Sequence, residues 1–107
     1  MKRKILITGG AGFIGSHLAN YFHKKKYQIY IIDNLSTGFK SNIIKDAIFI
    51  KKNCEDVSII KRLKGIDFYC IYHLAGQSSG EYSSYHPFED FSSNVVGTIN
   101  MINICLK

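Results

Sequence analysis

The sequence contains little of what a membrane protein, a disulfide-bonded protein or a metalloprotein needs. No apolar run reaches the roughly 18 residues of a membrane-spanning helix, and the first expected strand begins about three residues from the N-terminus, which leaves no room for a signal peptide. The cysteines are odd in number and lack C-x-x-C spacing, so we expect reduced, buried thiols in a cytoplasmic protein at Cys54, Cys70 and Cys105. The histidines show no ligand-like spacing with one another or with the cysteines, so no metal site is predicted from His17, His23, His73 and His86.

Acidic residues are also few, with 8 Asp and Glu against 14 Lys and Arg and a formal net charge of +6. The basic residues are scattered and no aromatic-basic motif accompanies them, so a nucleic-acid ligand is not expected. The one basic run, Lys24–Lys26, falls where the first helix is expected to end, and it is typical of a solvated helix C-terminus. Hydrophobic residues make up 46% of the chain, which is enough for the core of one small domain.

Strand-like and helix-like apolar patterns alternate along the chain. Such alternation implies right-handed crossovers and a parallel sheet, so we expect an α/β fold of about four strands with helices on both faces. Asp56 is expected to cap the second helix and Gly65 to end it. The expected strands are 4–8, 28–33, 47–51 and 67–74, the expected helices are 13–25, 56–63 and 88 onward, and 75–87 is expected to be a loop that ends at the only proline.

The most informative stretch is Ile5–Gly15, in which a strand pattern runs into a glycine cluster and a helix pattern follows at once. A dinucleotide phosphate site needs this order, because the backbone must turn tightly and the helix must aim its unpaired N–H groups and positive dipole end at the pyrophosphate. Two glycine frames fit this role, and the sequence leaves both open: Gly9-x-x-Gly12-x-x-Gly15 and Gly10-x-Gly12-x-x-Gly15.

Further groups complete the expected cofactor site. The backbone N–H groups of Phe13 and Ile14 would meet the pyrophosphate at the start of the helix. Asp33 lies about 18 residues beyond the last glycine, near the interval at which a carboxylate binds an adenosine ribose. An Asp-Asn pair is also a common turn, because both side chains bind their own backbone, and that alternative stays open. Because Asn34 and Leu35 carry no positive charge, the site favours NAD over NADP.

Four motifs in register carry a family resemblance: Thr8–Gly15, Asp33–Gly38, His73–Ser78 and Asn94–Thr98. With them the chain resembles the N-terminal half of an extended short-chain dehydrogenase/reductase, and more narrowly the NAD-dependent nucleotide-sugar epimerase/dehydratase group. The resemblance implies an incomplete doubly wound parallel sheet of the Rossmann type, as the N-terminal part of an NAD-binding domain whose C-terminal catalytic and substrate part is absent. It also implies a nucleotide-sugar substrate, no nucleic-acid or membrane partner, and a homodimer in the full-length form.

The resemblance also assigns contacts residue by residue. Relatives carry Asp followed by an apolar residue where Asn53 and Cys54 stand, and the Asn carbonyl oxygen can still accept a hydrogen bond from the adenine amino group without charge assistance. Leu74 and Asn94 are assigned to the cofactor site, with core packing as the open alternative for Leu74 and a helix cap or helix-surface position as the open alternative for Asn94. The implied cofactor-binding set is Gly9, Gly12, Phe13, Ile14, Gly15, Asp33, Asn34, Leu35, Ser36, Thr37, Gly38, Asn53, Cys54, Leu74, Ala75, Gly76 and Asn94. The weaker candidates for substrate contact are Gln77, Ser78 and Ser79.

The catalytic signature of similar enzymes is a Tyr-x-x-x-Lys pair with a Ser or Thr before it, in which the Lys lowers the pKa of the Tyr hydroxyl for proton exchange with a sugar. The only match in this sequence, Tyr21–Lys25, lies on the first helix, where Tyr21 is on the order of 12 Å from Phe13 and away from the nicotinamide. We therefore predict no catalytic residue in this chain. The leading hypothesis is an NAD-binding fragment of an enzyme that passes hydride to and from tightly bound NAD. The alternatives are a catalytically silent NAD-binding or partner-binding module, or an inactive remnant.

Overall fold

The computed structural model describes residues 2–76 and 79–106. Its strands are β1 (Lys4–Thr8), β2 (Gln28–Ile32), β3 (Ile48–Ile50) and β4 (Phe68–His73). Its helical elements are α1 (Phe13–Lys24), the 3₁₀ turn η1 (Lys40–Asn42), α2 (Ser58–Leu63), α3 (Gly80–Tyr85), α4 (Pro87–Phe91), the π-helical turn η2 (Ser92–Val96) and α5 (Gly97–Leu106).

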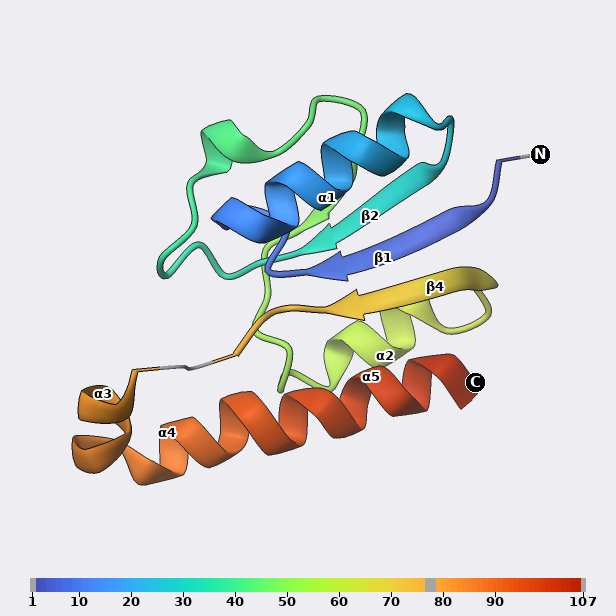
Figure 1. Ribbon diagram of the computed structural model, residues 1–107. Coiled ribbons are helices and arrows are strands. Elements are labelled where there is room, and N and C mark those ends of the chain that lie inside the picture. The colour runs from blue at the N-terminus through green and yellow to red at the C-terminus, as the bar shows by residue number, and fades with distance from the viewer. Residues whose placement is uncertain (1, 77–78, 107) are drawn as a thin grey trace.

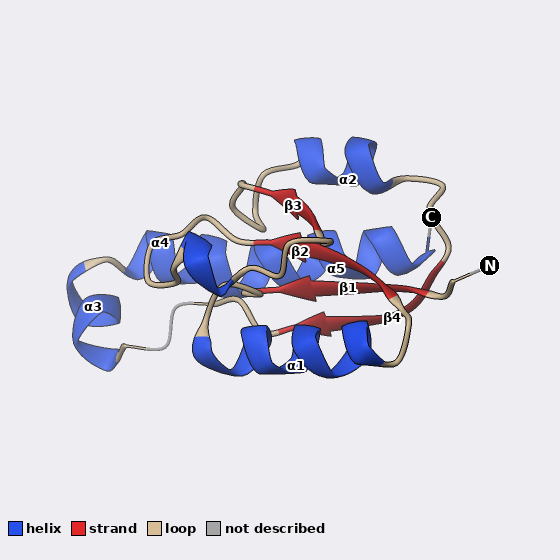
Figure 2. Ribbon diagram, turned by 90° about the horizontal axis from the view of Figure 1, so that it is seen from above, coloured by secondary structure: helices blue, strands red, loops and turns tan. Residues whose placement is uncertain are grey.

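The strands form one parallel sheet in the order β3-β2-β1-β4. Helix α1 covers one face of the sheet, while α2 and α5 cover the other (Figure 1, Figure 2). A parallel sheet needs this cover on both faces, because both are apolar. The carboxyl ends of the strands lie at one edge of the sheet, so the segments that follow them meet there (Figure 1).

Alternate side chains of the central strand β1 enter the two halves of the core. Ile5 and Ile7 pack with Ala19 of α1, whereas Leu6 packs with Ile59 of α2 on the opposite face. The three β1 side chains are 0% exposed. Burial of each such side chain contributes about 1.5–3 kcal/mol, so β1 holds the glycine loop that follows it firmly in place.

The predicted elements up to β4 are confirmed, with boundaries that differ by at most two residues. Asp56 lies just before α2, and its Oδ1 accepts a hydrogen bond from the Ser58 N–H at 2.9 Å, although Val57 and not Asp56 occupies the N-cap position. This bond holds the pKa of the Asp56 carboxyl below its ordinary value of 3.8, with a smaller contribution from Lys52. Gly65 follows α2 with φ +87, a left-handed value that favours glycine at a helix end.

The segment expected to be a loop before the last helix contains α3, so that expectation is wrong for residues 80–85. Ser79 explains the extra helix, because its Oγ accepts a hydrogen bond from the Tyr82 N–H at 3.2 Å and so caps α3. Pro87 then begins α4 at its first position, where its missing N–H costs nothing.

The expectation of three buried thiols is wrong for Cys105. The buried side of α5 consists of Gly97, Asn100, Met101 and Ile104, and Cys105 is exposed. Cys54 is buried and Cys70 is half-buried. Within the described parts of the chain, no helix has the length and apolarity needed to cross a membrane.

Candidate cofactor site

The glycine loop after β1 lies at the edge of the sheet where the strands end. Gly9 has φ +71, so it makes the turn that favours glycine. A Cβ at Gly15 would overlap the Gly9 carbonyl oxygen, so this glycine lets α1 pack against the loop. Gly10 serves packing instead, because its Cβ would lie 2.5 Å from the Ile31 side chain. The structure thus gives Gly9 the turn and Gly10 and Gly15 close packing, and the choice between the two glycine frames stays a prediction.

Gly12 is less crowded by neighbouring atoms than Gly10 and Gly15 are. Its φ of −81° and ψ of 179° are open to any residue, and the nearest atom to an added Cβ is the Gly9 carbonyl oxygen at 3.3 Å. It directly precedes α1, which has no side-chain cap and no acidic residue in its first turn. The first-turn N–H groups, including those of Phe13 and Ile14, have no acceptor within the helix. This end of α1 therefore suits a phosphate.

Asp33 follows β2 and is buried, with 8% of its surface exposed. Its Oδ2 accepts a hydrogen bond from the Ala11 N–H at 2.9 Å, and its Oδ1 accepts one from the Leu35 N–H at 2.7 Å. The second bond supports Leu35 at φ +63, an uncommon value for a residue with a side chain. The turn alternative is thus present, but each carboxylate oxygen has a further lone pair for a ribose hydroxyl.

Asn34 and Asn53 connect the ends of β2 and β3. The Ser36 N–H donates to Asn34 Oδ1 at 2.9 Å, and Asn34 Nδ2 donates to Asn53 Oδ1 at 2.7 Å. Both Asn side chains are exposed. Asn53 therefore lies beside the segment that carries Asp33, and its contact with adenine stays a prediction.

The loop after β2 folds back on Ala11 of the glycine loop. The Ala11 carbonyl oxygen accepts hydrogen bonds from the Phe39 N–H at 3.2 Å and from Asn42 Nδ2 at 3.0 Å. A Cβ at Gly38 would lie 2.8 Å from this carbonyl, so Gly38 permits the approach. Sequence reasoning missed Ala11 and Asn42, because their contacts join segments far apart in the chain. The exposed residues of this loop include Ser36 and Thr37.

Thr8 connects the ends of β1, β3 and β4 through side-chain contacts, and the sequence did not identify it as a site residue. Its Oγ1 lies 2.7 Å from His73 Nδ1, accepts the Ala75 N–H at 3.1 Å and is hydrogen-bonded to the Cys54 side chain. Burial raises the pKa of the Cys54 thiol to about 11 and lowers the pKa of His73. The Cys54 side chain therefore belongs to the core. Leu74, by contrast, is 45% exposed, which favours its predicted role at the site over core packing.

Helix α5 fixes the segment after β3 from the other side. Asn100 is 4% exposed, and its Nδ2 donates to the Cys54 carbonyl oxygen at 2.8 Å. A Cβ at Gly97 would lie 3.1 Å from Cys54 Cβ, so a glycine lets the helix come close. An Asn in an apolar helix pattern carries no local signal of such a partner, which is why Asn100 was not predicted.

Asn94 lies in η2, next to Gly76 at the end of β4. A Cβ at Gly76 would lie 2.8 Å from Asn94 Oδ1, and Asn94 Nδ2 donates to Asp90 Oδ1 at 3.0 Å. Single π-helical turns are rare and frequently mark functional sites. The structure thus brings Asn94 to the predicted edge, and its contact with a cofactor stays a prediction. Of the substrate candidates, Ser79 caps α3, and Gln77 and Ser78 lie outside the described residues.

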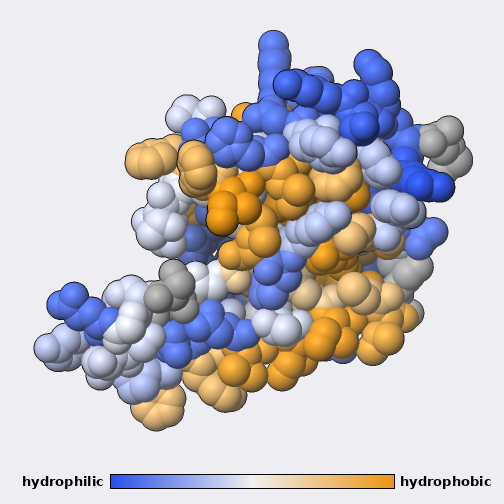
Figure 3. Space-filling model, viewed as in Figure 1, coloured by the Kyte–Doolittle hydropathy of each residue, from blue (hydrophilic) through white to orange (hydrophobic). Residues whose placement is uncertain are grey.

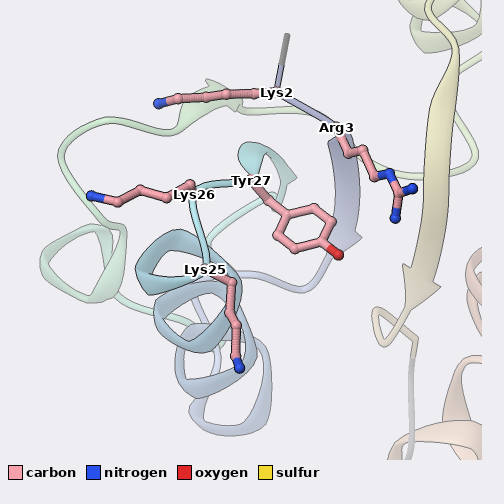
Figure 4. Close-up of a pocket in the computed structure, with 5 residues that line it drawn as sticks. All are labelled: Lys2, Arg3, Lys25, Lys26 and Tyr27. Carbon is pink, nitrogen blue, oxygen red and sulfur yellow. The ribbon is translucent and has the colours of Figure 1, made fainter.

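Cavities among the described residues include one at each end of the sheet. One of about 540 Å³ opens beside the glycine loop, and its lining includes Gly12, Phe13 and Thr37 of the predicted set. The other, of about 510 Å³, is lined by Lys2, Arg3, Lys25, Lys26 and Tyr27 (Figure 4). Lys2 and Lys26 extend to one side in Figure 4 and Arg3 to the other, where its guanidinium lies 4.4 Å from the centre of the Tyr69 ring. This second cavity therefore does not gather its charges around one ligand position.

The predicted decoy Tyr21–Lys25 lies on α1. Lys25 Nζ is 5.4 Å from the centre of the Tyr21 ring, which is a cation–π contact on the surface of that helix. In the segments that the structure describes, no three His, Cys, Asp or Glu residues are grouped so that they could hold a metal ion.

A parallel sheet with a glycine loop after β1, an uncapped helix at that loop and a carboxylate at the end of β2 defines a dinucleotide-binding α/β domain. A family model described as the NAD dependent epimerase/dehydratase family matches residues 5–107. The chain belongs to this family, as its motifs predicted.

Relatives of this chain are longer proteins. UDP-glucuronic acid decarboxylase 1 of Danio rerio is 34% identical over 108 residues, which cover 99% of this chain and 25% of that protein. UDP-glucose 4-epimerase of Thermotoga maritima, solved with UDP-glucose, gives a TM-score of 0.88 at 33% identity over 94% of this chain and 33% of the other. UDP-glucose 4-epimerase of Thermus thermophilus, solved in complex with NAD, gives 0.82 at 30% identity over 95% and 33%. The chain thus spans a quarter to a third of their lengths, and the predicted Rossmann-type fold is confirmed.

Proposed function

We propose that this chain is the NAD-binding N-terminal part of a nucleotide-sugar epimerase or dehydratase. When bound, NAD would supply the nicotinamide ring that accepts hydride and returns it. The N–H groups of Phe13 and Ile14 hold the pyrophosphate, Asp33 accepts the ribose hydroxyls, and Asn53 faces the base. The segment Leu74–Gly76 and Asn94 line the end of the site at β4.

The observation that carries this proposal is Gly12. Its backbone angles permit a side chain, and an added Cβ would meet one atom, the Gly9 carbonyl oxygen, in a tight contact at 3.3 Å, yet the residue in front of the open end of α1 has no side chain. A phosphate group that approaches the helix N-terminus needs the space that a side chain at this position would fill. The buried Asp33 carboxylate then supplies acceptors at the end of the neighbouring strand.

The substrate of the whole protein is proposed by likeness. Two structural relatives are named UDP-glucose 4-epimerases, so we expect a nucleotide sugar to bind next to the nicotinamide. Residues 1–107 would then form the N-terminal part of the NAD-binding domain. The homodimer of the full-length form and the cytoplasmic location stay predictions.

Replacement of Gly12 by Val tests the cofactor site. The Val side chain would occupy the space in front of α1, so NAD affinity measured by calorimetry should fall at least about tenfold. The backbone angles suit Val, but the contact of 3.3 Å with the Gly9 carbonyl oxygen is tight, so thermal melts accompany the calorimetry and NAD affinity is compared on folded protein.

The matched control is Gly80→Val, because a Cβ at Gly80 would meet no atom within 4 Å. This control should bind NAD as the wild type does, and circular dichroism should show both variants folded. A folded wild-type chain that does not bind NAD, or a Gly12→Val chain that binds it with unchanged affinity, would contradict the proposal.

A second candidate is a catalytically silent NAD-binding module. The sequence favours it in one respect, because its only Tyr-x-x-x-Lys pair lies on α1. Both candidates predict NAD binding, but only the first predicts that the whole protein reduces and reoxidises bound NAD with a UDP-sugar. Absorbance of reduced nicotinamide during turnover separates them.

A further inference from the structure

Basic residues gather at the amino edge of the sheet, which is the edge at which its strands begin. Lys2–Lys4 lead into β1, Lys24–Lys26 lie at the end of α1, and Lys61, Arg62 and Lys64 lie at the end of α2. These segments meet because β1 pairs with both β2 and β4, and each connecting helix returns to the start of the next strand. Hydrophilic residues accordingly cover the upper right of the molecule in Figure 3, where α1 ends and the chain begins in Figure 1. In the segments that follow the strands at the opposite edge, Asp and Glu outnumber Lys and Arg.

Ion pairs within the chain do not neutralise this edge. Among the described residues, the ion pair that involves a lysine is Lys52–Asp56, which lies at the opposite edge. The negative end of the α1 dipole explains a positive charge in the last turn of that helix. It does not explain Lys2 and Arg3, because they precede a strand, and a sheet has only a small net dipole.

Lys26 occupies a backbone conformation that costs free energy for a residue with a side chain. Its φ is +70, in the left-handed region. Its N–H donates to the His23 carbonyl oxygen at 3.0 Å, so it holds the position directly after α1 at which glycine or asparagine is usual. A lysine that remains at a strained position is a reason to look for a function of its charge.

The shape of the amino edge limits the kind of anion that fits it. Its hollow of about 510 Å³ is lined by Lys2, Arg3, Lys25, Lys26 and Tyr27, whose charged ends spread in different directions (Figure 4). One compact anion cannot contact these charges together. A flat lipid surface cannot enter the hollow either, so the shape favours an extended chain that carries several negative charges.

The aromatic residues near this edge favour a polypeptide over a nucleic acid. Single-stranded nucleic acid binds by stacking its bases on aromatic rings as well as by charge. The exposed rings of Tyr21 and Tyr69 already contact cations of this chain, with Lys25 Nζ 5.4 Å and the Arg3 guanidinium 4.4 Å from their centres. Lysine also outnumbers arginine at this edge, whereas arginine is the residue best suited to phosphate.

We propose that the amino edge of the sheet binds an extended acidic segment of a partner protein. An extended chain advances about 3.3 Å per residue, so successive carboxylates can contact lysines that lie too far apart for one anion. The amino edge lies opposite the candidate cofactor site, so both can be occupied at once. The inference therefore does not depend on the proposed function.

Fluorescence anisotropy with a labelled oligoglutamate peptide tests this proposal. The full chain should bind the peptide, and the affinity should fall as salt is added, because salt screens charges at a surface. An oligouridylate of the same length carries one negative charge per residue, as the peptide does, and vesicles of phosphatidylcholine with phosphatidylserine present an anionic lipid surface. Both should bind the chain more weakly than oligoglutamate does.

Two variants remove charge from the hollow. Lys26→Gly removes one charge and suits the left-handed backbone, so it should fold and should weaken oligoglutamate binding by about threefold. The triple variant Lys2→Gln, Lys25→Gln and Lys26→Gly should weaken it at least about tenfold. Both variants should bind NAD as the wild type does, because the changes lie at the edge opposite the cofactor site.

The matched control is the triple variant Lys40→Gln, Lys51→Gln and Lys52→Gln, which removes the same charge from three exposed lysines at the opposite edge. This control should bind oligoglutamate as the wild type does, and circular dichroism should show that the proteins compared are folded. An equal loss of affinity in the two triple variants would mean that net charge alone attracts the peptide, and it would overturn the proposal. Absence of oligoglutamate binding by the folded wild type, or tighter binding of oligouridylate or of the vesicles, would also overturn it.

Discussion

Asp33 has a structural role and a proposed binding role at the same time. Its carboxylate holds the Ala11 and Leu35 N–H groups, and its remaining lone pairs are available to a ribose. We expect Asp33→Ala to weaken NAD binding by about 1 to 3 kcal/mol, because charge-assisted hydrogen bonds are lost. Calorimetry with NAD measures this loss, and thermal melts of the unliganded chain measure the separate loss of stability.

Asp46→Ala is the control for the removal of one carboxylate. Asp46 is exposed, and its carboxylate lies 3.1 Å from His23 at the far end of α1. Its loss should leave NAD affinity unchanged. If Asp33→Ala lowers the melting temperature but binds NAD as the wild type does, Asp33 is a turn residue only.

Single residues could be predicted from sequence where a local pattern marks them. Gly9, Gly12 and Asp33 stand at fixed intervals from a strand and a helix, so the motif identifies them. Thr8 and Asn100 could not be found in this way. Their partners lie 65 and 46 residues away, and only the folded sheet brings them together.

At the scale of elements, α2 begins beside a carboxyl group that titrates, that of Asp56. The Ser58 N–H bond lowers the pKa of Asp56, so the ionised carboxylate stabilises the fold above the ordinary pKa of 3.8. This contribution is lost as the pH falls through the lowered value in the folded state. We expect wild-type stability against urea to fall between about pH 5 and pH 2, in part for this reason.

Asp56→Asn keeps an acceptor for the Ser58 N–H but cannot ionise, so its stability should fall less over the same range. Asp56→Ala keeps no acceptor and should already be less stable than the wild type at neutral pH. Urea midpoints from circular dichroism compare the three proteins. An equal acid loss in the wild type and Asp56→Asn would show that this carboxyl group does not contribute to acid sensitivity.

The elements up to β4 were predictable because the hydrophobic residues of each recur at the spacing of either a strand or a helix. Ile29, Ile31 and Ile32 read as a buried strand, and Leu18, Ala19 and Phe22 recur at helical spacing. Beyond β4 the sequence carries weaker signals. A single cap at Ser79 is enough to form α3 within a polar stretch, and the π-helical turn η2 interrupts a pattern that reads as one continuous helix.

At the scale of the whole molecule, one part of the exposed apolar surface follows the outer side of η2 and α5. Hydrophobic residues follow the lower side of the molecule in Figure 3, where α5 lies in Figure 1. The exposed fractions are 42% for Val95, 51% for Ile99, 52% for Ile102 and 75% for Leu106. A continuous apolar face of this kind favours association with another surface.

We expect the chain of 107 residues to self-associate through this face. Burial of each such side chain is worth about 1.5–3 kcal/mol, so several of them together are comparable to the roughly 5–15 kcal/mol by which a domain is stable. The double change Ile99→Lys and Ile102→Lys should raise the fraction of monomer in sedimentation velocity, because it places two charges on the apolar face.

The charge itself needs a control, since two added lysines also increase repulsion between molecules. Thr98→Lys with Asn103→Lys adds the same charge at two exposed positions of α5 and leaves the apolar face intact. This control should associate as the wild type does, if contact through the apolar face drives assembly. A wild-type chain that is a monodisperse monomer with a cooperative melt would contradict this expectation. It would also strengthen the case for an independent NAD-binding module, because such a chain folds without a partner for α5.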